Sequence, residues 1–284
     1  MQRGTQVYAG AALFALLVTA SLVRAETKKE FRFTVGPRPS LSVINQYGPI
    51  SAKPSAGNEI IVVAVLKSDK VEVDQSKNGN RIDLVSHLLP GASIDNARVE
   101  YQITAPPGTN LTLHTTTGDI QVEKMHGDLA IEGASANVDV RDVANCHVHV
   151  NTLNGPIMLT NVTDGHVELT SVSGNITLRK VDGPLVRVNS SSGSIRYDGD
   201  FAFGGEYSLT SHTGDIEATA PSYASIDVTA RSVKGQVDNE FPLQPKTHSA
   251  FSMDTVRNLV GTAGKAASSV KLLSFSGKIH LKKR

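Results

Sequence analysis

A glycine recurs through the second half of the sequence, and the residues around it recur with it. If this glycine is position zero, eight copies follow one another at intervals of 18, 19, 19, 19, 21, 21 and 42 residues. The positions seven and five residues before it, and two after it, are apolar in every copy. A pattern that repeats at such an interval predicts a stack of similar units. The eight copies are centred on Gly118, Ala136, Gly155, Gly174, Gly193, Gly214, Gly235 and Gly277.

Each copy carries the alternation of a β-strand on both sides of the glycine. In the copy centred on Gly174, Val167 and Leu169 come before it, and Ile176 and Leu178 come after it. A period of two places apolar side chains on one face of a strand, and a glycine between two strands favours a corner. We therefore predict an all-β fold, a β-helix-like β-solenoid of two-strand coils of about 19–21 residues. Stacked coils would align the inward Val, Ile and Leu side chains into buried ladders.

The sequence divides into three parts. Residues 1–25 form a predicted signal peptide, residues 26–108 an irregular β-sheet entry or cap section with one repeat-like copy near Gly48, and residues 109–284 the solenoid. Within the solenoid, segment 239–269 is loosened. The interval of 42 residues is interpreted as two coils, the first of them degenerate, and the last copy as the final coil of the stack. The degenerate coil is fitted on Phe251, Met253, Asn258 and Val260.

The first 25 residues have the composition of an export signal. Arg3 precedes an uncharged run from Val7 to Val23, and Val23-Arg24-Ala25 resembles a cleavage site. Cleavage would start the mature chain at Glu26 and place it outside the cytoplasm, in the periplasm, at the cell surface or in the medium. The alternative is an uncleaved membrane anchor, because the run is close to the shortest that spans a bilayer. Membrane association is expected only in that case.

The amino-acid composition excludes several classes of function. The formal net charge of +1 argues against a nucleic-acid-binding protein, which needs an excess of Lys and Arg to neutralise phosphates. Cys146 is the only cysteine, so the chain can form neither an internal disulfide nor a zinc site of several cysteines.

Three histidines are the candidate metal ligands. The repeat places His147 over His166 in the next coil, with His149 on the same strand face as His147. Imidazoles gathered on an exposed face can bind a metal such as zinc, although outward polar side chains are commonly only solvated. The acidic residues stand beside corners, where Asp is favoured because it accepts hydrogen bonds from nearby backbone N–H groups. We assign no catalytic residue, no cofactor-binding residue, no cofactor and no metal ligand.

Several motifs resemble a known family. They include L-S-V-I-N-Q-Y-G-P-I, the junction V-E-Y-Q-I-T-A-P-P-G-T-N-L-T-L-H-T-T-T-G-D-I, the S-G-N-I and T-G-D-I turns, and the final V-K-L-L-S-F-S-G-K-I-H-L. Together they resemble the adhesin-like family of bacterial β-strand-repeat proteins of the DUF4097 type, over roughly Leu41 to Leu281. The resemblance implies a bacterial extracytoplasmic β-helix-like protein and supplies no catalytic residues. Ala136 in a glycine position and segment 239–269 depart from the pattern.

These observations favour a non-enzymatic exported β-solenoid, an adhesin-like surface or envelope module that binds or supports other molecules. Its partner would be a glycan, another cell-envelope polymer or a second surface protein. A carbohydrate-active β-helix enzyme is an alternative, which requires two close carboxylates in a cleft. An envelope-anchored sensor or regulatory protein is the other alternative, and it requires that the N-terminal segment stay uncleaved.

Overall fold

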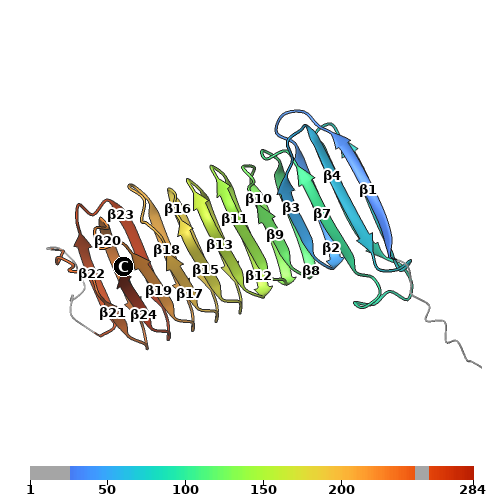
Figure 1. Cartoon of the computed structure of the whole chain (residues 1–284). Helices are drawn as coiled ribbons and strands as arrows, with labels where there is room; N and C mark the ends of the chain where they lie inside the picture. The colour runs from blue at the N-terminus through green and yellow to red at the C-terminus, as the bar shows by residue number, and fades with distance from the viewer. Residues whose placement is uncertain (1–25, 247–255) are drawn as a thin grey trace, which may run out of the picture.

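The computed structural model describes residues 26–246 and 256–284, and these form 24 strands in two twelve-stranded sheets (Figure 1). Figure 1 shows an elongated stack that begins at β1 and ends at β22 and β21. The first sheet, sheet A, contains in spatial order β1 (Thr27–Thr34), β4 (Glu59–Leu66), β7 (Val99–Ala105), β3 (Ile50–Pro54), β9 (Ile120–Glu123), β11 (Val138–Ala144), β13 (Ile157–Thr163), β15 (Ile176–Val181), β17 (Ile195–Asp198), β19 (Ile216–Ala220), β24 (Ile279–Lys283) and β21 (Val237–Asn239). The predicted all-β solenoid is confirmed.

Sheet B faces sheet A across the core, so each coil has one strand in each sheet. Its strands in spatial order are β22 (Asn258–Ala263), β20 (Ile226–Ser232), β23 (Ser268–Ser274), β18 (Glu206–Ser211), β16 (Leu185–Ser190), β14 (His166–Ser171), β12 (His147–Asn154), β10 (Leu129–Ser135), β8 (Asn110–Thr117), β2 (Ser40–Tyr47), β6 (Arg81–Leu88) and β5 (Val71–Asn78).

Parallel pairing aligns the apolar positions into the expected ladders. Ile157 pairs with Ile176, Ile176 with Ile195, and Ile195 with Ile216, and all four side chains are fully buried. Of the twenty-four apolar flanking positions in the eight copies, only Val237 is not buried, because β21 is the edge strand of sheet A. The core is therefore a set of aliphatic rows between two sheets, and its main stabilisation is the removal of these side chains from water.

The glycines at position zero are explained by close contact between corners. A Cβ atom on Gly193 would lie 2.0 Å from the carbonyl oxygen of Gly174. Ala136 is tolerated because the residue three positions earlier is Gly133, and a Cβ there would lie 2.5 Å from the Ala136 Cβ. The missing side chain at Gly133 thus leaves room for the methyl group at Ala136.

The position three residues before each of the seven corner glycines holds a polar side chain, which is buried in six copies and half-buried at Ser190, and sequence reasoning did not place it in the core. In four copies a serine hydroxyl here accepts a hydrogen bond from the glycine N–H, for example Gly214 N–H to Ser211 Oγ at 2.9 Å. This position has the same parity as the apolar positions before it, so its side chain must also point inward. The buried serine satisfies an N–H that the corner leaves without a strand partner.

The entry section belongs to the same two sheets as the repeats. The copy near Gly48 forms β2 and β3, which pair in parallel with β8 and β9. The chain then runs outward, so that β6 and β7 stack on the far side of β2 and β3. Antiparallel strands complete this end, with β5 on β6 and with β4 and β1 beside β7. This part of the chain therefore covers the first coil, and its edge strands carry charged residues that discourage pairing with other chains.

The last copy is not the final coil of the stack, so that prediction was wrong. Strand β23 lies between β18 and β20, and β24 lies between β19 and β21. The prediction of a degenerate coil was also wrong for the two of its residues that the structure describes. Asn258 and Val260 lie in β22, which pairs antiparallel with β20 and so does not continue the parallel stack. The chain must run back along β20 before its last segment enters the stack, and an antiparallel strand makes that return. Phe251 and Met253 lie outside the described residues.

The lengthening of the coils from 19 to 21 residues coincides with an aromatic cluster at the second corner. The rings of Tyr197 and Phe201 stack at a centroid distance of 5.1 Å, and Tyr207 meets both edge-on. The Tyr197 hydroxyl donates to the carbonyl oxygens of Val181 and Asp200. Burial raises the pKa of Tyr197 well above its ordinary value, so it stays a neutral hydrogen-bond donor.

The predicted signal peptide lies outside the described residues. Within the part of the chain that the structure describes, no helix has the length and hydrophobicity to cross a membrane.

Candidate functional site

The outward face of sheet B carries a row of exposed apolar side chains beside the glycine corners. The residue two positions before the corner glycine is apolar and exposed in four copies, and it is Ser191 and His212 in the two coils that lie between them. Leu153 and Val172 follow each other in adjacent coils, and Phe275 and Val233 follow each other at the C-terminal end. Between 37% and 53% of each of these side chains is exposed. Apolar side chains that align on a solvated face favour an interaction surface.

At the C-terminal end this row forms one wall of a groove, which we call the C-terminal groove. Its volume is about 470 Å³. The three serines on its floor, Ser190, Ser211 and Ser274, succeed one another along the stack. The lining residues are Ser190, Thr210, Ser211, His212, Arg231, Val233, Leu273, Ser274 and Phe275. A second hollow of about 330 Å³ continues from it through Arg231 and Leu273 toward Lys271 and Val260.

The groove exists because of the inserted last coil. Phe275 follows β23, so it stands between His212 after β18 and Val233 after β20. Its ring stacks on the His212 ring at a centroid distance of 4.9 Å and an interplanar angle of 7°, and the Lys234 Nζ lies 4.8 Å from the Phe275 centroid. These contacts fix the orientation of the Phe275 ring along the side of the groove.

One buried hydroxyl beneath the groove has no partner in the described part of the chain. The Ser190 hydroxyl oxygen is buried and makes no hydrogen bond with any described residue, whereas Ser211 and Ser274 each accept one from a glycine N–H. Buried hydroxyls normally find a partner, but the Ser190 side chain points into the core like those of Ser211 and Ser274, so its hydroxyl does not face the groove.

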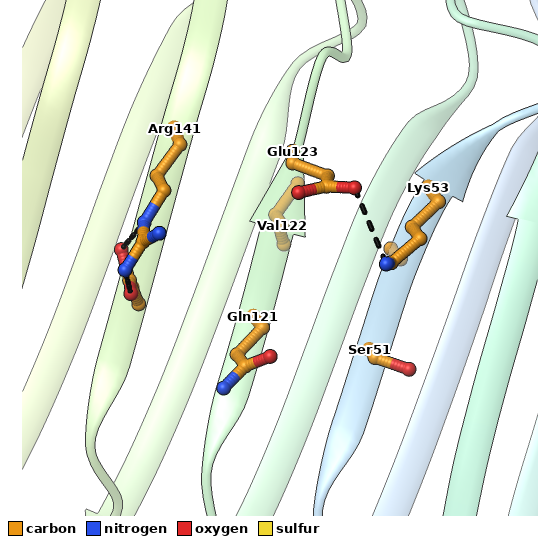
Figure 2. A pocket seen from close by; sticks show the side chains of 8 residues that line it. Ser51, Lys53, Gln121, Val122, Glu123 and Arg141 are labelled. Carbon is orange, nitrogen blue, oxygen red and sulfur yellow. Dashed lines mark hydrogen bonds and ion pairs between the residues drawn. The ribbon is translucent and has the colours of Figure 1, made fainter.

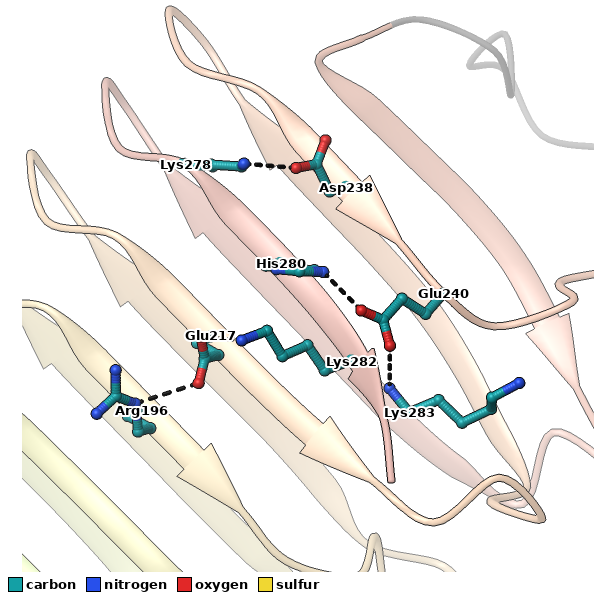
Figure 3. Close-up of polar contacts among 8 residues, drawn as sticks. All are labelled: Arg196, Glu217, Asp238, Glu240, Lys278, His280, Lys282 and Lys283. Carbon is teal, nitrogen blue, oxygen red and sulfur yellow. Dashed lines mark hydrogen bonds and ion pairs between the residues drawn. The ribbon is translucent and has the colours of Figure 1, made fainter.

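On the outward face of sheet A at the same end, Arg196, Lys278 and Lys282 are ion-paired (Figure 3). Lys282 Nζ lies 2.7 Å from the Glu217 carboxylate, which Arg196 also contacts at 3.2 Å, and Lys278 Nζ lies 2.6 Å from the Asp238 carboxylate. The hydrogen bond from Lys282 is the main cause that lowers the pKa of Glu217. These pairs join β24 to its neighbours on both sides.

A small polar depression on sheet A is the place to examine the enzyme alternative, because two carboxylates line it (Figure 2). Lys53 Nζ lies 3.3 Å from the Glu123 carboxylate. Both oxygens of Asp139 accept from Arg141, at 2.8 and 2.5 Å, and this raises the pKa of Arg141. The depression holds only about 150 Å³. Each carboxylate is thus neutralised by a cation, which is the opposite of what a general acid requires.

The histidines lie where the repeat placed them. His147 pairs with His166, and their rings stack at a centroid distance of 4.8 Å. His149 is directed toward Glu168, with the Nδ1 atom 3.8 Å from the carboxylate. Among the described residues, no group of three or more His, Cys, Asp and Glu side chains could hold a metal ion. The metal hypothesis therefore finds no third ligand in this part of the chain.

The corner aspartates have the structural role expected of them. Asp128 accepts from the His147 N–H at 3.0 Å, and Asp215 accepts from the Lys278 N–H at 2.7 Å. Each bond joins one coil to the next, which explains why acidic residues stand at corners without gathering into a catalytic pair.

The fold and its exposed faces define a two-sheet parallel β-solenoid whose outward side chains are free to meet other molecules. The chain belongs to the Toastrack DUF4097 family, whose model matches residues 40–282. The family resemblance seen in the sequence is thereby confirmed.

Similar solved structures come from bacteria. A "putative adhesin" from Bacteroides fragilis is 13% identical, and the match covers 92% of this chain and 98% of that one with a TM-score of 0.50. A "putative cell adhesion protein" from Clostridium sporogenes is also 13% identical, with 91% and 100% covered and a TM-score of 0.30. At these identities the first likeness shows the fold alone. No curated protein matches the chain.

Proposed function

We propose that this protein is an exported, non-enzymatic, adhesin-like binding module that works outside the cytoplasm, and that its ligand binds at the C-terminal groove. The observation that carries the proposal is the groove itself, where the exposed apolar side chains of Val233 and Phe275 lie beside the exposed Arg231 on a stack of paired strands. Concave sites of this composition are typical of ligand binding. The adhesion-related names of the structural neighbours support the same function.

The non-enzymatic part of the proposal rests on the carboxylates. Glu123 and Asp139, which share a depression, are both ion-paired, and the corner aspartates bond to backbone N–H groups. The acidic groups whose pKa is displaced, Glu217, Asp238 and Glu240, have a lowered pKa and stay ionised. A glycoside-cleaving enzyme needs a carboxylic acid that holds its proton near neutral pH.

The test is a binding screen with the full chain, expressed so that it can be exported. The protein would be presented to a glycan array and to isolated cell-envelope fractions. A groove variant, Leu273→Ser with Phe275→Ser, would be compared with Leu153→Ser, which alters an exposed apolar residue in the same row but four coils from Phe275. The proposal predicts that the groove variant loses binding and that Leu153→Ser retains it. Equal binding by both variants would contradict it.

Two further readouts separate the alternatives. Bound oligosaccharides recovered after incubation should be intact by mass spectrometry, and shortened products would indicate the carbohydrate-active enzyme. N-terminal sequencing of the exported protein should find Glu26 as the first residue, and an intact N-terminal segment would favour the anchored sensor.

A further inference from the structure

Three cations around the C-terminal groove have no acidic partner within residues 26–246 and 256–284. Arg231, Lys234 and Lys271 are exposed, and none of them forms an ion pair with a described residue. On the other face of the same coils, Lys278 and Lys282 are both ion-paired. Lys278 and Lys282 thus join β24 to its neighbours by ion pairs, whereas Arg231, Lys234 and Lys271 form none with the described residues.

Carboxylates are also missing from this part of sheet B. The outward positions run in alternate residues along β18 from Ser208 to His212, along β23 from Lys271 to Phe275, and along β20 from Thr229 to Val233, and none is acidic. The nearest outward acid on β20, Asp227, is ion-paired with Lys246. The face around the groove is thus positive, and it complements an anionic ligand.

The direction of the groove limits the shape of that ligand. Its floor passes from Ser190 to Ser211 to Ser274, one residue per coil, so a ligand in it runs along the stack and across the strands. Neighbouring strands are about 4.8 Å apart, which is close to the length of one pyranose residue in an extended chain. Hydroxyl groups of a sugar would meet the outward Thr210 hydroxyl, and its C–H groups would meet the wall formed by Phe275 and Val233.

We propose that the C-terminal groove binds an acidic polysaccharide that lies along the stack, with one carboxylate at the coil of β20, which carries both Arg231 and Lys234. This inference rests on the proposed function and specifies the class of ligand. Arg231 can form two parallel hydrogen bonds with a carboxylate, and Lys234 can act as a point charge beside the ring of Phe275. The Thr210 hydroxyl, which lines the groove on the outward face of β18, can hydrogen-bond to a sugar hydroxyl.

The experiment is a calorimetric titration of the full chain with an oligogalacturonate and with its methyl ester, which has the same sugar backbone without the charges. The proposal predicts binding of the acid form, weakening with added salt, and about tenfold or greater loss with the Arg231→Gln/Lys234→Gln variant. The matched control is Arg179→Gln, which removes an exposed cation from the outward face of sheet A. Arg179→Gln should bind like the unaltered protein. Circular dichroism of the unaltered protein and both variants should give the same spectrum, which would show that the fold is unchanged.

The other outcomes separate the two proposals. If the ester binds as well as the acid and Leu273→Ser/Phe275→Ser abolishes both, the binding function stands and the acidic class is wrong. If Arg179→Gln weakens binding as much as the double variant, the attraction is a general charge effect and the groove proposal is overturned. Preferential binding of polyglutamate would replace the polysaccharide with an acidic peptide. Absence of binding to either sugar and to every envelope fraction would overturn both proposals.

Discussion

A Cβ atom on Gly277 would lie 2.1 Å from the carbonyl oxygen of Gly214, although 63 positions separate these residues in the sequence. The contact places the last corner of the chain directly on the corner of an earlier coil. The corner of Gly235, which comes between them in the sequence, lies on the outer side, where its own Cβ would be 2.3 Å from the Gly277 carbonyl oxygen.

Gly277→Ala should therefore destabilise the C-terminal coils, because the added methyl group can be accommodated only if two corners separate. We expect a loss of about 1–3 kcal/mol in the free energy of unfolding, measured with denaturant. Gly57→Ala is the control, since a Cβ at Gly57 would meet nothing within 4 Å. It should change stability by less than about 0.5 kcal/mol. Equal effects of the two variants would mean that the corners are not in contact.

Gly133 and Ala136 should show strong coupling. Gly133→Ser places a side chain against the Ala136 methyl group, which is 2.5 Å from the position of the new Cβ. The single variant should lose stability, and Ala136→Gly in the same chain should restore much of the loss, because it recreates the Ser-x-x-Gly arrangement of other coils. A double-mutant cycle by thermal unfolding would measure the coupling, expected at about 0.5–3 kcal/mol. Additive effects would contradict this explanation.

Ser211→Ala should leave the Gly214 N–H without its hydrogen-bond partner in a buried corner. The expected cost is about 1–3 kcal/mol. Ser208→Ala removes a hydroxyl from the outward face of the same strand and should have little effect. Urea unfolding of both variants provides the comparison, and a silent Ser211→Ala would show that the buried serines do not support the corners.

Glu217 should make the C-terminal coils sensitive to acid. Its pKa is lowered in the folded protein from an ordinary value of 4.5, mainly by the hydrogen bond from Lys282. A lowered pKa means that the stabilisation is present above the ordinary value and is lost as the pH falls through the lowered one. The unfolding temperature should therefore decline below about pH 4.5, and less steeply in Glu217→Gln. Glu206→Gln, on the other sheet, should keep the slope of the unaltered protein; identical slopes in all three would contradict the role of Glu217.

The aliphatic ladders were predictable because alternation and repetition are local properties of the sequence. Ile176 and its partners are apolar, recur at the coil interval and have fixed parity, so their burial follows from strand geometry. The stacking of His147 on His166 followed from the same interval. The burial of Ser211 followed in principle from parity as well, yet a polar residue beside a corner is more readily interpreted as exposed.

The order of the last coils was not predictable, because every copy offers the same apolar rows to its neighbours. The copy around Gly277 can stack equally well, by its core residues, on either side of the copy around Gly235. Outward residues distinguish the two arrangements, since Lys282 pairs with Glu217 on one side and Lys278 with Asp238 on the other. The C-terminal groove could not be predicted either, because His212, Phe275 and Val233 become neighbours only when the last coil is inserted.

The insertion of the last coil is the central claim, because the groove and both proposals depend on it. It is tested most directly by disulfide formation in a Cys146→Ala chain. Ser208 pairs with Lys271, and Lys271 with Thr229, so Ser208 and Thr229 are two strand spacings apart, about 9.6 Å. Disulfides need Cα atoms within about 7 Å. Under mild oxidation, mass spectrometry should find a disulfide in Ser208→Cys/Lys271→Cys and none in Ser208→Cys/Thr229→Cys. A disulfide in the second variant alone would show that the coils stack in sequence order.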